Sequence, residues 1–170
     1  MERCEQCGYV WEVVGRDEIG PRTRGAAAAI ADRVRAERGP ARHRPAPGTW
    51  SALEYAAHVR DVLLIMRDRP VLGLVEDDPT FTPLYRDERL ALGLYDAEDP
   101  DGTAVELEAA SAMFTRVFDA IGGDQLGRPV QFGYPPSTRS LLWLGQQVVH
   151  EVEHHLGDVE RGLLALAEPD

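Results

Sequence analysis

Histidines near the C-terminal end of the chain have the spacing of metal ligands. His150 and His154 stand one helical turn apart in the segment His-Glu-Val-Glu-His-His-Leu-Gly-Asp, residues 150–158. Side chains four residues apart lie on one helix face, so both imidazoles can reach a single ion. The apolar run before them indicates a buried helix, where an imidazole needs a hydrogen-bond partner or a metal. With His58, on an earlier helical segment, the predicted metal ligands are His58, His150 and His154.

The neighbours of these histidines receive other predictions. His155 lies about 100° around the helix from His154, so it is expected to face the first helix or a subunit surface. Glu151 is likewise not expected to bind the metal. Asp158 follows His154 by one turn and is predicted to orient it as a hydrogen-bond acceptor.

The same residues allow an alternative. His150-Glu151-Val152-Glu153-His154 matches the His-Glu-x-x-His pattern of zincin peptidases, in which Glu151 would be the general base on a zinc-bound water. Gly157 and Glu160 even match the turn and third ligand of metzincins. The predicted elements include no sheet to support such a site, so a zincin-type metallopeptidase is the less favoured alternative.

The two cysteines form a separate candidate site. Cys4 and Cys7 occur in Cys-Glu-Gln-Cys-Gly, the spacing of half a zinc knuckle. A closed zinc site needs four ligands, so a second chain, His43 or an acidic residue would have to complete it. A structural zinc site, a disulfide or redox pair and idle thiols all stay open, and we predict that the pair lies outside the catalytic centre.

Composition excludes several classes of function. The chain of 170 residues has 29 acidic and 18 basic residues, a net charge of −11, which opposes nucleic-acid binding. It contains no Lys, which excludes Schiff-base chemistry and a lysine-dependent phosphate loop. Neither a membrane-spanning apolar run nor a signal-peptide pattern is found, so we expect a cytoplasmic protein that does not bind membranes.

Four helical segments must position these residues. Periodicity and capping signals predict helices over about 21–38, 51–68, 103–121 and 137–167, with a short strand or arm at 9–14. Ser51 and Glu54 have the spacing of a capping box, and Pro70 is expected to close the helix that carries His58. Residues 71–100 are irregular around a short helix at 86–94, and are predicted to form a lid.

The predicted fold class is therefore all-α, a four-helix bundle with its site in the core between facing helices. We divide the chain into an N-terminal Cys-x-x-Cys extension, residues 1–18, and the bundle, residues 19–170.

Two motifs together resemble a known family. Trp-Ser-Ala-Leu-Glu-Tyr-Ala-Ala-His-Val-Arg-Asp at 50–61, followed by His-x-x-x-His-His-x-x-Asp, is similar to the DinB-like (YfiT-like) metalloproteins over residues 19–166. That superfamily includes mycothiol-dependent maleylpyruvate isomerases and bacillithiol S-transferases. The resemblance implies a four-helix bundle with a metal on three histidines, which map to His58, His150 and His154. Gly157-Asp158 departs from the Gln that many members have after this Gly.

The resemblance also implies a function. Three nitrogen ligands would leave an open position on a divalent metal, with zinc expected first and nickel, manganese or iron as alternatives. A bound thiol would lose its proton at neutral pH, which predicts a metal-dependent thiol S-transferase or thiol-dependent isomerase. The co-substrate would be a low-molecular-weight thiol, mycothiol rather than bacillithiol, and the substrate an electrophilic small molecule. A non-catalytic metal-binding or stress-associated bundle is the alternative, and a homodimer stays open.

The catalytic groups are not assigned from the sequence. Four arginines are candidates to hold an anionic substrate: Arg60, Arg86, Arg89 and Arg139. Four aromatic residues are candidates for the cavity wall: Trp50, Phe81, Tyr85 and Trp143.

Overall fold

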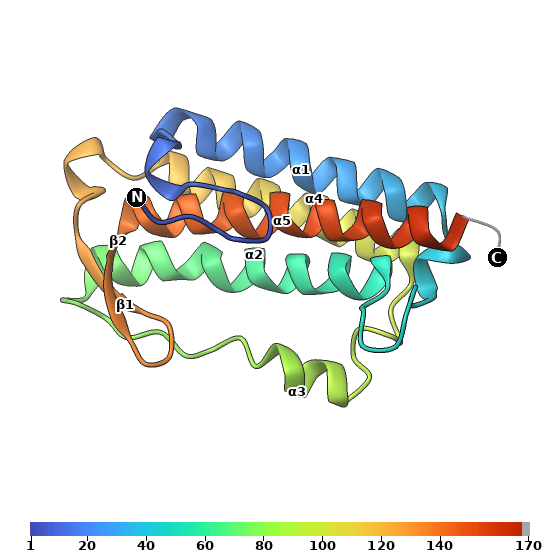
Figure 1. Ribbon diagram of the computed structural model, residues 1–170. Helices are drawn as coiled ribbons and strands as arrows, with labels where there is room; N and C mark the ends of the chain where they lie inside the picture. The colour runs from blue at the N-terminus through green and yellow to red at the C-terminus, as the bar shows by residue number, and fades with distance from the viewer. Residues whose placement is uncertain (168–170) are drawn as a thin grey trace.

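Four long helices pack side by side in the computed structural model, which describes residues 1–167 (Figure 1). They are α1 (Arg16–Ala36), α2 (Ala52–Val75), α4 (Pro100–Asp119) and α5 (Leu141–Ala167). α1 and α2 each pack against both α4 and α5, so the order around the bundle is α1, α4, α2, α5. The predicted all-α four-helix bundle is confirmed.

Shorter elements lie at the edges of the bundle. Helix α3 spans Arg86–Ala91, and strands β1 (Pro129–Phe132) and β2 (Ser137–Ser140) pair antiparallel. Single turns of 3-10 helix occur at Trp11–Val13, Pro40–Arg42 and Gly123–Gln125.

The helix that carries His58 begins at the predicted capping box. Ser51 Oγ accepts a hydrogen bond from Glu54 N at 3.1 Å, and Glu54 accepts one from Ser51 N at 2.7 Å. The prediction that Pro70 closes this helix is wrong, because α2 continues to Val75. Its last turn is held by tight packing at Gly73, where a Cβ would lie only 2.9 Å from Val130 Cγ1, so tertiary contacts outweigh the hydrogen bond that proline removes.

The start of α5 also differs from the prediction. Residues 137–140, predicted as helix, form β2 opposite β1, and α5 begins at Leu141 with Ser140 Oγ accepting a hydrogen bond from Trp143 N. The hairpin has strands of only four residues, too short for a clear alternating pattern. A bridge between Thr80 and Gln131 ties it to the irregular segment after α2.

The short strand or arm predicted at 9–14 is part of a small N-terminal hairpin. Arg3 and Val10 make an isolated antiparallel bridge, and residues 11–13 are a 3-10 turn. This segment lies across α5 between α1 and α2 (Figure 1). α1 then begins at Arg16, before the predicted start at 21, because Glu18 accepts a hydrogen bond from Gly15 N at 2.9 Å.

The helices enclose one apolar core, which includes Leu53, Leu107, Phe114, Leu144 and Val148. Within residues 1–167, every helix is too short or too polar to span a membrane.

Candidate metal centre

α5 presents two pairs of metal-ligand side chains, each pair one helical turn apart. The pairs are offset by one residue, and therefore by about 100° around the helix axis. Ligand atoms lie within 4.8 Å of one another in three groups: His58 with Glu151 and His155; Cys4 and Cys7 with His150 and His154; and, within α5 alone, His154 with His155 and Asp158. The first group joins α5 to α2, and the second joins α5 to the N-terminal hairpin.

The first group has the geometry of a three-ligand metal centre. Glu151 Oε2 lies 3.5 Å from His155 Nε2 and 4.0 Å from His58 Nε2. Nitrogen and oxygen ligands of tetrahedral zinc are about 3.4 Å apart, so small side-chain adjustments would accommodate an ion. His58 is 3% exposed, and its Nδ1 is buried without a hydrogen-bond partner in residues 1–167. Two imidazoles and one carboxylate fit zinc and similar divalent ions.

The surroundings favour the metal-binding protonation states of two of these residues. Burial, with a smaller effect of His155, lowers the pKa of His58 to about 4, so its imidazole is neutral at pH 7. Burial alone would raise the pKa of Glu151, but its hydrogen bond to His155 and the nearby imidazoles lower it to about 2. His155 differs, because hydrogen bonds to Asp158 and Glu151 outweigh burial and raise its pKa.

Two further side chains hold the ligands in place. Asp158 Oδ2 lies 2.8 Å from His155 Nδ1, which leaves Nε2 of that ring facing Glu151. Gln147 donates a hydrogen bond to Glu151 Oε1 at 2.7 Å and accepts one from Trp11 Nε1 at 2.8 Å. Such outer contacts fix the orientation and basicity of metal ligands.

The group opens into a cavity of about 230 Å³, with His58 and Glu151 in its wall. The cavity lies between α2, α5, the segment before α3 and the turn of the β1–β2 hairpin. Its apolar and aromatic lining comprises Val62, Ile65, Met66, Phe81, Pro83, Leu84, Phe132 and Tyr134. Such a lining excludes water from a bound small molecule and leaves polar groups to orient it.

Two arginines line this cavity. Arg86 is one of the predicted candidates, whereas Arg69 was missed. Arg69 is buried, donates to Thr82 O at 2.7 Å and lies over the rings of Phe81 and Phe132. Burial lowers its pKa to about 10, so it stays charged at neutral pH. Its position eleven residues after His58, three helical turns on the same face, is the signal that could have identified it.

All four candidate arginines have carboxylate partners, and Arg86 contacts the neighbouring Asp87 at 3.3 Å. Arg60 and Arg89 both contact Asp61, and Arg139 contacts Glu2.

Of the candidate aromatic residues, Phe81 lines the cavity, and Trp50 packs against His58 with ring centroids 5.5 Å apart.

The grouping of the histidines differs from the one expected from the sequence. Within the described chain, His58 does not form a group with His150 and His154, and its neighbours are Glu151 and His155. Asp158 is predicted to orient His154, and its Oδ2 lies 3.5 Å from His154 Nε2 but only 2.8 Å from His155 Nδ1. The zincin alternative also differs from this arrangement. It requires Glu151 to act on a water bound to a metal on His150 and His154, whereas Glu151 contacts His155 and His58 on the α2 side of α5.

Replacing Asp158 by asparagine should weaken metal binding at the His58–Glu151–His155 group. The negative charge that orients His155 is lost while the side-chain size is kept, and we expect a loss of about 10–100-fold in affinity. Competition with a chelator of known affinity measures it, in a Cys4→Ser, Cys7→Ser background so that the second group does not contribute. Glu160→Gln, on the exposed side of the same helix, is the matched control. Equal affinities in the two variants would contradict the orienting role.

Comparisons with known proteins agree with this architecture. The family model of the DinB superfamily matches residues 22–159. Among solved structures, YfiT from Bacillus subtilis, described as a probable metal-dependent hydrolase with an unusual four-helix bundle topology, aligns with a TM-score of 0.81 and 18% identity over 99% of this chain and 95% of that one.

A mycothiol-dependent maleylpyruvate isomerase also aligns, with a TM-score of 0.69 and 16% identity over 88% of this chain. The alignment covers 62% of the isomerase chain. No curated protein sequence matches. At these identities the solved structures show a shared fold, and the family match over most of the sequence establishes that this chain belongs to the DinB superfamily.

Proposed function

We propose that the protein is a divalent-metal-dependent enzyme that activates a low-molecular-weight thiol, similar to mycothiol, for attack on an electrophilic small molecule. The observation that carries this proposal is the position of His58 and Glu151 in the wall of the cavity, so that the ligand set is open toward a bound molecule. A buried group closed by a fourth side chain would instead favour a non-catalytic metal site.

The ligands leave room for one more anion. His58 and His155 are donors that bind metals as neutral imidazoles, and Glu151 contributes one negative charge. A divalent ion on this set would retain one positive charge and lower the pKa of a thiol bound to it, so that the thiolate forms at neutral pH. We propose zinc as the ion, because this donor set suits it.

The cavity supplies the other requirements of the proposed reaction. Arg69 and Arg86 bring positive charge to its wall, which suits a substrate or thiol that carries a carboxylate. The apolar lining limits the access of water that would compete with the thiol. The similarity of the fold to a mycothiol-dependent isomerase supports a thiol as the co-substrate.

Turnover of zinc-loaded protein with mycothiol, or a surrogate thiol, and an anionic electrophile such as maleylpyruvate tests the proposal. We expect thiol-dependent turnover, and no turnover after the metal is removed by a chelator. Hydrolysis of esters or amides without any thiol would instead assign a hydrolase, and a metal-loaded protein inactive toward both would favour the non-catalytic bundle.

The role of Arg69 can be tested separately. Arg69→Met keeps much of the side-chain length but removes a charged hydrogen-bond donor. A hydrogen bond to a charged group contributes about 1.5–3 kcal/mol, so KM for an anionic substrate should rise about 10–100-fold. Arg116→Met, an exposed position on α4, is the control. An unchanged KM in Arg69→Met would place the anion elsewhere.

A further inference from the structure

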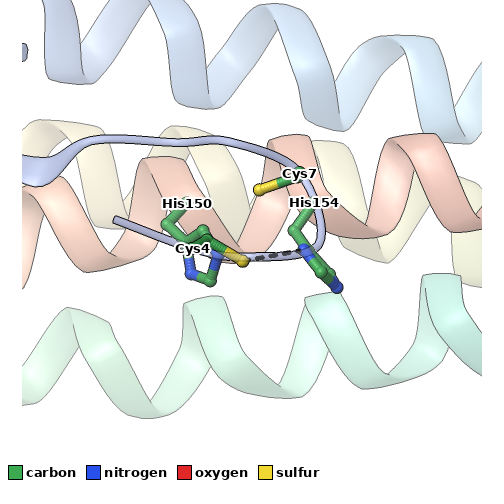
Figure 2. A group of neighbouring side chains, drawn as sticks. All are labelled: Cys4, Cys7, His150 and His154. Atoms are coloured by element: carbon green, nitrogen blue, oxygen red, sulfur yellow. Dashed lines mark hydrogen bonds between the residues drawn. The ribbon is translucent and has the colours of Figure 1, made fainter. Parts of the chain in front are cut away.

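The second group of ligands joins residues that are far apart in the sequence. Cys4 and Cys7 lie in the N-terminal hairpin, and His150 and His154 lie on α5 (Figure 2). One ligand atom from each residue lies within 4.8 Å of the others, and Cys4 Sγ is 3.9 Å from His154 Nδ1. Sulfur and nitrogen ligands on tetrahedral zinc are about 3.6 Å apart, so the observed spacing is close to that of a formed site.

The two cysteines lie in a tight backbone turn of the N-terminal hairpin. Gly8 N donates to Cys4 O at 2.9 Å, and Cys4 N donates to Tyr9 O at 2.8 Å, which closes a tight turn around the two thiols. Gly8 has φ of +76°, a conformation that glycine adopts without strain. The turn therefore presents Cys4 and Cys7 on one side, toward α5.

An independent observation comes from His150. Both of its ring nitrogens are buried, and neither has a hydrogen-bond partner among residues 1–167. The ring is packed by Tyr9 and Trp11, with centroids 5.2 and 4.6 Å away. A buried imidazole with no partner is costly, and a metal bond would satisfy one of its nitrogens.

His154 is oriented for the same role. Its Nδ1 faces Cys4, while its Nε2 lies 3.5 Å from Asp158 Oδ2. A carboxylate near the second ring nitrogen is one of the partners that orient metal-binding histidines.

We propose that Cys4, Cys7, His150 and His154 bind a structural Zn²⁺ ion that fastens the N-terminal hairpin to α5. The donor set is Cys₂His₂, with the Cys-x-x-Cys and His-x-x-x-His spacings of closed zinc sites. Binding forms two zinc–sulfur and two zinc–nitrogen bonds, and the two thiol protons pass to the solvent. Two thiolates balance the charge of the ion. Four protein ligands leave no open position, so the ion has a structural role.

The zinc site would also support the neighbouring centre. The hairpin leads into Trp11, which donates to Gln147, and Gln147 donates to Glu151. Fixing the hairpin on α5 would hold this chain of hydrogen bonds. The inference does not depend on the proposed thiol chemistry, because its ligands and its measurement are separate.

Cobalt titration of the full chain tests the inference, since cobalt bound by thiolates shows sulfur-to-metal charge-transfer absorption and the His58–Glu151–His155 group contains no sulfur. Wild-type protein should show this absorption and His155→Ala should retain it. The Cys4→Ser, Cys7→Ser double variant should lose it, together with one equivalent of zinc. Cobalt binding without charge transfer in the wild type, or full zinc content in the double variant, would overturn the inference.

A second measurement needs no variant. Zinc should protect both thiols of the reduced wild-type protein from alkylation, and a chelator should remove the protection. Equal alkylation rates with and without zinc, or a Cys4–Cys7 disulfide that persists when zinc is supplied under reducing conditions, would overturn the site. If the wild-type protein shows the sulfur-to-cobalt absorption but no thiol-dependent turnover, only the proposed function is contradicted.

Discussion

Replacing His155 with alanine is expected to remove the divalent ion from the His58–Glu151–His155 group. The variant keeps only two of three ligands, so we expect a loss in affinity of more than the 10–100-fold that altering an outer contact causes. The proposed activity should disappear with the ion. Metal content after dialysis, combined with chelator competition, measures the loss. This result would reverse the expectation from sequence alone, in which His155 faces away from the metal.

Two comparisons make this experiment specific. It is best done in a Cys4→Ser, Cys7→Ser background, so that only one kind of site is measured. In that background His154→Ala should retain the ion, because His154 lies with the cysteines and not with His58. His43→Ala, at an exposed position before α2, is a control for the loss of any imidazole. Loss of the ion in His154→Ala, with retention in His155→Ala, would restore the ligand set His58, His150 and His154.

Gly145→Ala is expected to destabilise the bundle by about 1–3 kcal/mol, the usual cost of overpacking a core. A Cβ at this position of α5 would lie 2.8 Å from Ile19 Cδ1 and closer still to the ring of Phe118. The three helices α1, α4 and α5 therefore meet at a point where only glycine fits. Thermal unfolding should show a decrease in Tm of about 2–4 °C for each kcal/mol.

Gly25→Ala is a control in which the free energy of unfolding should change in the opposite direction. Gly25 lies on α1, and a Cβ there would meet nothing within 4 Å. Alanine should stabilise this helix by about 0.5–1 kcal/mol, because glycine loses more backbone entropy on folding. If Gly145→Ala also stabilised the protein, the close approach of α5 to Phe118 and Ile19 would be disproved.

Much of the architecture follows from local patterns in the sequence. Apolar residues at helical spacing predicted the four long helices, and the Ser51–Glu54 capping box located the start of α2. The end of α2 and the β1–β2 hairpin did not follow. Pro70 is an unfavourable residue inside a helix, and it is tolerated because of packing around Gly73 that involves residues far along the chain.

The candidate site was likewise predictable from the sequence only in part. The sequence by itself determined that α5 carries ligand side chains one turn apart, because i and i+4 positions share a helix face whatever the fold. It did not determine which pair faces which partner. His150 and Glu151 differ by only about 100° around the axis, and both pairs fit the helical spacing. The tertiary structure decided the grouping. It places α2 beside Glu151 and His155, and the N-terminal hairpin beside His150 and His154. Only the fold could decide this, because a metal site depends on distances between side chains from segments that are distant in sequence.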